Sequence, residues 1–410
     1  MRIVLLMVVA LAACVSASAP PPPPPPAPFA VLPSMIDPAA VCAVTTASTA
    51  VAITDTATST GEMAEIEDDG AAEVEARTTS VAPGTPLVRY TLDLSDVALI
   101  EAWKTKPEGL GTISVGFADE GRLINSRQFP CDGGDVWTVV QPPTTWGTTE
   151  TIDAVVAAAQ RVKSIYPGAL PLRVNSISAQ DGGHLRPHRS HQNGRDVDLG
   201  FYYPTATPVG GRARETIMDL GPNWELVKSL FMTGDVQVVL VDRRVQKVLY
   251  AFALARGEDK GWLDSLFLAT RNAPIQHARG HRDHFHVRYF NPRAQELGRR
   301  IAPLLAMRPE HNLITHRVRN GDTLGALAVK YNSGVKAIQK ASRMKSTFLR
   351  LGQVLHIPIH GPCTQCPVPP PFELPPRRIP PPIKLAEVPP AVTATVSAIG
   401  VPSSPLSALP

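Results

Sequence analysis

The sequence predicts an α+β fold with a mainly antiparallel sheet. Apolar side chains recur at helical spacing between Ile152 and Val162, whereas residues 283–290 alternate as in a strand with one buried face. Helical and extended patterns are mixed in this way along the middle of the chain, and such a mixture favours an α+β fold. The 42 prolines of this 410-residue chain concentrate at its two ends, which places the folded units between them.

The largest folded unit is expected to span residues 135–306. Thr149 is expected to cap its first helix, and Pro167-Gly168 to end that helix. The elements expected after it are a strand at Leu172–Ser178, a helix at Asn223–Met232, strands at Val236–Val241 and Val248–Leu254, a short helix at Trp262–Thr270 and a last strand at Asp283–Phe290. Before this unit, alternation at Val88–Leu94 and Ile113–Phe117 predicts a small β-rich region at residues 84–134, to which we assign no role.

The N-terminus has the pattern of an export signal. Arg2 precedes an apolar run, Ile3–Ala13, that is too short for a mature membrane helix. The run ends in Leu-Ala-Ala-Cys, which resembles a bacterial lipobox, in which the cysteine is lipidated. We therefore expect a signal peptide at residues 1–14 and a lipoprotein anchored through Cys14 in the periplasm of a Gram-negative bacterium. Ordinary cleavage that discards Cys14 is the alternative.

Both ends of the chain are expected to be disordered. Residues 15–83 contain the unbroken run Pro20–Pro26, a stiff polyproline II spacer, and then a segment rich in Ala, Thr, Ser, Glu and Asp. Residues 360–410 form a second Pro-rich tail with few aromatic side chains. Net charge is only +4, so nucleic acid is not an expected partner, and the sequence does not indicate an oligomeric state.

The remaining cysteines agree with an exported protein. Cys42, Cys131, Cys363 and Cys366 form an even set, as expected in an oxidising compartment. Cys363 and Cys366 have the spacing of a zinc half-site, but no second close pair exists. A local disulfide, or two bridges to Cys42 and Cys131, is favoured, and the sequence does not choose between these pairings.

Histidines and carboxylates concentrate in two short segments of the central unit. The first contains His188, His191, Asp196 and Asp198, and the second runs from His277 to His286 and contains four of the 11 histidines. Because side chains two apart in a strand point the same way, Asp196 and Asp198 share one face, as do His284 and His286. Imidazole and carboxylate are the ligands of catalytic zinc, which uses three protein ligands and one open position.

These strings resemble a known family of metallopeptidases. His191 to Asp198 matches the His-x6-Asp motif, and His284-Phe285-His286 the His-x-His motif, of the lysostaphin and D-alanyl-D-alanine metallopeptidase superfamily. The longer strings are closer still to the penicillin-insensitive murein endopeptidases. The stretches that match are Gly182-Gly183, His188–Gln192, Gly194–Asp198, His281 and His284–Arg288.

The resemblance implies a fold, a reaction and roles for six residues. The implied zinc ligands are His191, Asp198 and His286, the implied catalytic histidine is His284, and the further active-site histidines are His188 and His281. His188 and His281 would orient water or stabilise a tetrahedral intermediate. The implied fold is a small antiparallel sheet with flanking helices and long loops, and the implied reaction is hydrolysis of the D-alanyl–meso-diaminopimelyl amide in cross-linked peptidoglycan. His277 has no counterpart, and Asp196 is expected to make structural hydrogen bonds.

Residues 314–359 have the order strand, helix, helix, strand and resemble a LysM module. The turn Gly321–Leu324 and the ending Gly352–Pro358 carry the match. The resemblance implies binding to glycans that contain N-acetylglucosamine. Ser342 stands where such modules usually have Asn. A module of this kind would raise the concentration of the enzyme at the wall.

Two other functions remain open on the sequence alone. A D,D-carboxypeptidase that removes terminal D-alanine would use the same zinc chemistry on a different bond. A wall-binding protein that no longer cleaves is the non-enzymatic alternative, and the complete set of zinc ligands together with His284 disfavours it. A purely structural zinc would require four closed ligands.

Overall fold

The structure, a computed structural model, describes residues 72–77, 84–206, 213–269, 273–308, 310–360 and 371–382. The expected signal peptide, lipobox and proline run lie outside these ranges. Within them, no helix combines the length and the apolar character needed to cross a membrane.

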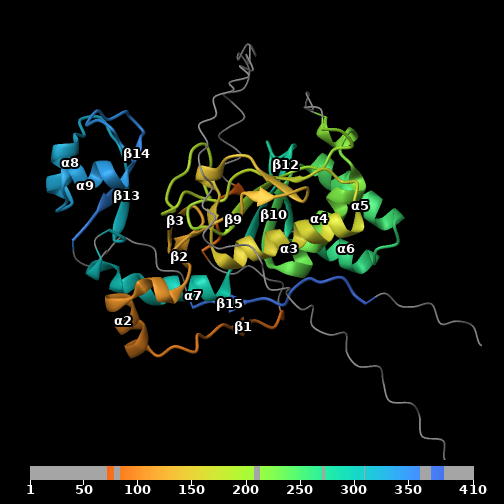
Figure 1. Cartoon of the computed structure of the whole chain (residues 1–410), viewed down its shortest axis with the longest axis horizontal. Coiled ribbons are helices and arrows are strands. Elements are labelled where there is room, and N and C mark those ends of the chain that lie inside the picture. Colours follow the sequence, from red (N-terminus) through yellow and green to blue (C-terminus); the bar gives the residue numbers. More distant parts are fainter. Residues whose placement is uncertain are drawn as a thin grey trace, which may run out of the picture. The chain divides into compact units, whose positions relative to one another are not determined.

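A mixed but mainly antiparallel sheet forms the centre of the fold, as predicted (Figure 1). Its strands lie in the order β11-β10-β12-β9-β8-β6-β5. The pairs β10–β11 and β6–β8 are parallel, and the other neighbours are antiparallel. The bounds are β5 Asp132–Gly133, β6 Trp137–Val139, β8 Leu172–Val174, β9 Asp196–Gly200, β10 Asp235–Val241, β11 Ile275–His277 and β12 His284–Phe290.

Strands β9 and β12 are direct neighbours, although about ninety residues separate them in the chain. Their register pairs His286 with Asp198, and Arg288 with Asp196. Because side chains alternate along a strand, these four polar side chains share one face. The intervening apolar side chains of both strands are buried on the other face. The register thus sets imidazole opposite carboxylate.

Helices flank this sheet, and Figure 1 shows α3 and α4 lying side by side. The bounds are α3 Thr149–Ile165, α4 Leu220–Thr233, α5 Arg243–Ala255 and α6 Lys260–Phe267. The expected strand at Val248–Leu254 is wrong, because this segment lies within α5. Val245, Leu249 and Ala253 form its buried stripe, at a spacing of four residues. A short apolar run has no clear period of its own, so its sequence alone fits a strand equally well.

Two expected boundaries shift by a few residues. Thr148 caps α3 in place of Thr149, and its hydroxyl accepts a hydrogen bond from the Thr151 N–H at 3.2 Å. The strand expected at Leu172–Ser178 is shortened to β8, Leu172–Val174. Beyond β8 the chain leaves the regular ladder, and the Ile177 carbonyl becomes available to a side chain of the site described below.

Residues 84–134 contain a helix as well as strands, and they pack against the segment that follows β12. The elements are α2 Asp96–Thr105, a 3-10 helix at Pro107–Leu110, the hairpin of β2 Ile113–Phe117 and β3 Glu120–Ile124, and β4 Arg127–Gln128, which pairs with β7 Trp146–Gly147. Helix α7, Pro292–Ile301, lies directly on this hairpin. A Cβ at Gly298 of α7 would overlap the Ser114 carbonyl oxygen in β2, so glycine permits this close approach.

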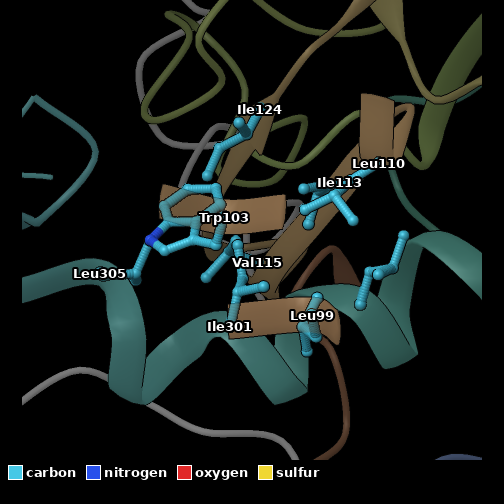
Figure 2. Close-up of a cluster of buried hydrophobic side chains, with 9 residues drawn as sticks. Leu99, Trp103, Leu110, Ile113, Val115, Ile124, Ile301 and Leu305 are labelled. Atoms are coloured by element: carbon cyan, nitrogen blue, oxygen red, sulfur yellow. The ribbon is translucent and has the colours of Figure 1, made fainter. Parts of the chain in front are cut away.

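Trp103 of α2 is the largest side chain of the core that joins these elements (Figure 2). Its ring is fully buried among Val115 and Ile124 of the hairpin, Ile301 at the end of α7 and Leu305 just beyond it. Its indole N–H donates to a backbone carbonyl in the 3-10 helix Ala302–Met307 at 3.0 Å. Residues 84–134 therefore share one hydrophobic core with residues 292–307.

We expect Trp103→Ala to lower the free energy of unfolding by about 3–5 kcal/mol, because it removes a fully buried ring and leaves a cavity. Urea denaturation followed by circular dichroism measures the effect. Val97→Ala is the control on the same helix, since Val97 is 79% exposed, and it should have little effect. Equal midpoints for the two variants would contradict a shared core.

The C-terminal unit has the predicted βααβ order. Its elements are β13 Leu313–Arg317, α8 Leu324–Lys330, α9 Val335–Ala341 and β14 Val354–Pro358, with β13 antiparallel to β14. Asp322 shapes the first turn: one carboxylate oxygen accepts the Arg319 N–H at 2.7 Å and lies 2.8 Å from His316 Nε2. The Ser342 hydroxyl exchanges hydrogen bonds with the backbone of His356, which ties the end of α9 to β14.

Parts of the segments predicted to be disordered are ordered. In the tail, β15 (Glu373–Leu374) pairs with β1 (Val88–Arg89), so the strand expected at Val88–Leu94 is reduced to two residues. The Arg378 carbonyl accepts the Trp262 indole N–H at 2.8 Å. In the N-terminal linker, residues 72–77 are ordered as well. Composition predicts disorder from the absence of a local core, and it does not register contacts to a distant domain.

Cys131 is disulfide-bonded. The other cysteines lie outside the described residues, so the pairing between them stays a prediction.

Candidate metal centre

The structure brings the six predicted site residues into one cluster. They are His188, His191, Asp198, His281, His284 and His286. At its centre three atoms form an equilateral triangle. Asp198 Oδ1 lies 3.2 Å from His191 Nε2 and 3.2 Å from His286 Nδ1, and these two nitrogens are 3.2 Å apart. Ligands at about 2.0 Å from a tetrahedral ion are separated by roughly 3.3 Å, so the triangle has the dimensions of one face of a zinc site.

The other nitrogen of each imidazole in the triangle faces an acceptor. His191 Nδ1 donates to the Ile177 carbonyl at 2.8 Å, which leaves a lone pair on Nε2. His286 Nε2 lies 3.5 Å from Asp196 Oδ2, and among the described residues it has no hydrogen-bond partner. Metal-binding histidines usually have their second nitrogen held, as that of His191 is. Asp198 Oδ1 is buried and has no hydrogen-bond partner, so three acceptor atoms converge where a cation would satisfy them.

A tight turn presents His191 to the strands. His191 has φ 62°, a conformation that few residues other than glycine adopt, and Gly194 follows with φ 76°. The His191 N–H donates to Asp196 Oδ2 at 3.2 Å, which fixes the turn against β9. A strained backbone of this kind persists only where its surroundings hold it, and it is common at functional sites.

Asp196 holds the framework of the site, as the sequence predicts, through a buried ion pair. Arg288 Nε donates to Asp196 Oδ1 at 2.6 Å, and Arg288 Nη2 to Oδ2 at 3.0 Å. Burial alone would raise the pKa of Asp196, but Arg288 and His286 hold it well below its ordinary value. Burial opposes the ionisation of Asp198 too, yet His191 and His284 keep its pKa well below the usual range. Both carboxylates are therefore ionised at neutral pH.

Comparison with known families adds independent information to this geometry. Residues 114–305 match the family model described as penicillin-insensitive murein endopeptidase. This domain belongs to that family. Residues 316–358 match the model of the LysM domain, which confirms the C-terminal module. A search of curated proteins found no match. The protein is a metallopeptidase that hydrolyses peptidoglycan. The match to the murein endopeptidases starts within the hairpin β2–β3, and so includes elements before residue 135.

His284 borders the centre of this peptidoglycan hydrolase. Its Nε2 is 3.7 Å from Asp198 Oδ1, and its Nδ1 lies 2.7 Å from Asp283 Oδ1. The His284 side chain is 23% exposed, whereas His191 and His286 are fully buried. A partly exposed imidazole, oriented by a carboxylate on one side, is suited to proton transfer.

His188 and His281 contact different members of the centre. His188 Nδ1 is 3.6 Å from Asp198 Oδ2, and the His281 ring lies 4.8 Å from the ring of His284. Burial lowers the pKa of His188 to about 4, and nearby His191 adds to the shift. Burial likewise lowers the pKa of His281 to about 3, with His284 adding to it. Both imidazoles are neutral at pH 7 and able to donate as well as accept hydrogen bonds.

Two carboxylates beside this centre are not predicted from the sequence. Asp283 sits inside the second histidine segment and could have been found there. Glu73 lies in the segment predicted to be disordered, and no local signal marks it. Among the residues that the structure describes, three overlapping groups have potential ligand atoms within 4.8 Å of one another: His188-His191-Asp198, His191-Asp196-His286 and Glu73-His281-His286.

His277 is not part of the cluster. It is exposed at the end of β11, and its Nδ1 accepts the Arg243 N–H at 3.0 Å. A histidine that is close to the site residues in the sequence therefore need not belong to the site.

Proposed function

We propose that the protein is a zinc-dependent endopeptidase that cleaves the D-alanyl–meso-diaminopimelyl amide of peptidoglycan cross-links. His191, Asp198 and His286 would hold the zinc. The observation that supports this most strongly is the 3.2 Å triangle of converging atoms, with the second nitrogen of His191 held by Ile177 O and that of His286 3.5 Å from Asp196. Two imidazoles, one carboxylate and an open side are the donor set of a catalytic zinc.

The side chains around the triangle have separate tasks in this proposal. When bound, zinc supplies an activated water at neutral pH and positive charge for the carbonyl oxygen. His284, held by Asp283 at 2.7 Å, would take a proton at Nε2 and return it to the leaving amine. His188 and His281, both neutral, would donate hydrogen bonds to the oxygen on which negative charge develops.

Products from defined muropeptides test the proposed bond. With purified cross-linked dimers, we expect monomers to accumulate, because an endopeptidase cuts the cross-link. We expect EDTA to abolish the reaction and added zinc to restore it. Release of free D-alanine from pentapeptide monomers, with dimers left intact, would instead establish a D,D-carboxypeptidase. Full activity after exhaustive chelation would contradict the requirement for a bound metal ion.

We further propose that the LysM domain holds the enzyme on N-acetylglucosamine-containing glycan. Phe348 and Leu351 support this, since they precede β14 and are 74% and 77% exposed, which suits apolar contact with sugar rings. We expect Phe348→Ala to weaken binding to insoluble peptidoglycan roughly tenfold in a sedimentation assay. Val329→Ala on α8, where Val329 is 85% exposed, is the control. If both variants bind peptidoglycan as well as the wild type does, Phe348 is not part of the glycan-binding surface.

A protein that acts on the cell wall works outside the cytoplasm, and we propose the periplasm with a lipid anchor on Cys14. The lipobox-like Leu11–Cys14 supports the anchor. Labelling cells with radioactive palmitate should mark the wild-type protein and leave Cys14→Ala unlabelled. Absence of label from the wild-type protein would indicate a free periplasmic enzyme.

A further inference from the structure

We infer that Glu73 is a positioning residue of the active site, supplied by a segment that precedes the family-matched domain. Its side chain holds the loop that carries His188 and His191. This inference rests on the proposed function, in which His191 binds the metal. The murein endopeptidase match begins only at residue 114, so it does not include Glu73.

One carboxylate oxygen of Glu73 collects three hydrogen bonds from this loop. Glu73 Oε2 accepts the Arg189 N–H at 2.9 Å, the Ser190 N–H at 3.0 Å and the Ser190 hydroxyl at 3.2 Å. Arg189 and Ser190 lie directly between the two histidines. The Glu73 residue is only 7% exposed, so water cannot easily replace it as the acceptor for these donors. The conformation of the loop therefore depends on this carboxylate.

Glu73 also lies beside the second histidine segment. A carboxylate oxygen of Glu73 and one nitrogen each of His281 and His286 lie within 4.8 Å of one another. The Glu73 carbonyl accepts a hydrogen bond from Arg288 Nη2 at 2.7 Å, and the same guanidinium pairs with Asp196. One residue thus contacts the loop of the first segment and the strand of the second.

The rest of the segment fastens Glu73 in place. Glu75 pairs with the fully buried Arg195, and its carboxylate also accepts the Ala118 N–H at 2.7 Å and the Gln237 amide at 3.1 Å. Arg77 binds Asp119 through both terminal nitrogens, at 2.9 Å and 3.1 Å. Detaching the segment would leave Arg195 buried without its countercharge, which is strongly unfavourable. Residues 72–77 are therefore a lasting part of the site, and not a removable cover.

Hydrogen exchange in the full-length protein tests the loop contact directly. In the wild type, the amides of Arg189 and Ser190 should exchange slowly, because Glu73 accepts both. In Glu73→Ala their exchange should accelerate at least about tenfold, and in Glu73→Gln by a smaller factor, because the amide oxygen is a weaker acceptor. This measurement needs no metal, so it stays informative if the wild type proves to bind no zinc. A wild-type protein that binds no zinc would count against the proposed function and leave the inference about Glu73 standing.

Zinc affinity and kinetics test the consequence for the site. Chelator competition should show zinc bound about 10–100-fold more weakly in Glu73→Ala, the usual effect of losing a residue that orients a ligand. With zinc in excess, kcat should fall while KM for a soluble muropeptide dimer changes little. For Glu73→Gln, zinc affinity and kcat should lie between those of the wild type and those of Glu73→Ala. If Glu73→Ala does not fold, Glu73→Gln decides by the same measurements.

Glu150 provides a matched control. Its carboxylate also accepts two backbone N–H groups, those of Arg293 at 3.1 Å and Ala294 at 3.0 Å, at the start of α7. Glu150→Ala should leave zinc affinity and the exchange of Arg189 and Ser190 unchanged. The inference would be overturned if both Glu73 variants showed the zinc affinity of the wild type and the same exchange rates at Arg189 and Ser190. A gain of activity in Glu73→Ala would also overturn it, by showing that the segment blocks the site.

Discussion

His191→Ala should lose bound zinc and at least about 1,000-fold in kcat/KM. His191 Nε2 is one corner of the triangle, and alanine offers no ligand atom in its place. Without it, His286 and Asp198 alone would hold the ion, which is too few ligands for stable binding. The metal's contribution to catalysis is several kcal/mol, and a loss of that size corresponds to a factor of roughly a thousand. Metal analysis of the purified variant and rates on muropeptide dimers measure the two effects.

His277→Ala is the matched control for this experiment. His277 belongs to the same histidine-rich sequence, but it is exposed at the end of β11 and contacts Arg243, away from the cluster. It should retain zinc and activity within about twofold of the wild type, as is usual for surface substitutions. A His191→Ala variant that keeps full zinc occupancy would show that the triangle is not the metal site.

Arg288→Met should lower the free energy of unfolding by about 3–5 kcal/mol. The change removes the cation that pairs with Asp196 in a fully buried site and leaves that carboxylate without its ion-pair partner. Burial would then raise the pKa of Asp196 with His286 left to oppose it, because Arg288 contributes to the low pKa of this carboxyl group. Urea denaturation of the metal-free protein measures the loss and keeps it separate from metal binding.

Arg127→Met tests the same chemistry on the surface. Arg127 and Asp153 are joined at 2.6 Å, the same distance as Arg288 and Asp196, but their side chains are 29% and 57% exposed. Solvent screens such a pair, and its loss should cost less than about 1 kcal/mol. The double variant Asp196→Asn/Arg288→Met should be less destabilised than the sum of its single variants, since neither charge is then left alone. If the changes in the free energy of unfolding are additive, Asp196 and Arg288 are not energetically coupled.

Short-range patterns in the sequence carried most of what could be predicted about the site. The alternation His284-Phe285-His286 predicts two imidazoles on one face of a strand because a strand repeats every two residues. The spacing from His191 to Asp198 includes Gly194, whose positive φ allows the turn. For the same reason the LysM domain could be predicted, since its elements contact one another within about 45 residues. The assignment of Val248–Leu254 failed because a short run of apolar residues carries too little periodicity to distinguish a helix from a strand.

Other features depend on which distant segments come into contact. Nothing near Asp198 in the sequence states that β12 is its neighbour, that His286 lies opposite it, or that the Ile177 carbonyl orients His191. Glu73 is the clearest case, because its surrounding composition predicts disorder, whereas its contacts with Arg189, Ser190 and Arg288 join it to distant parts of the chain. Residue types and their local spacing determine which atoms are available to bind a metal. The folded chain decides which of those atoms meet, since burial and strand pairing join residues across any distance in the sequence.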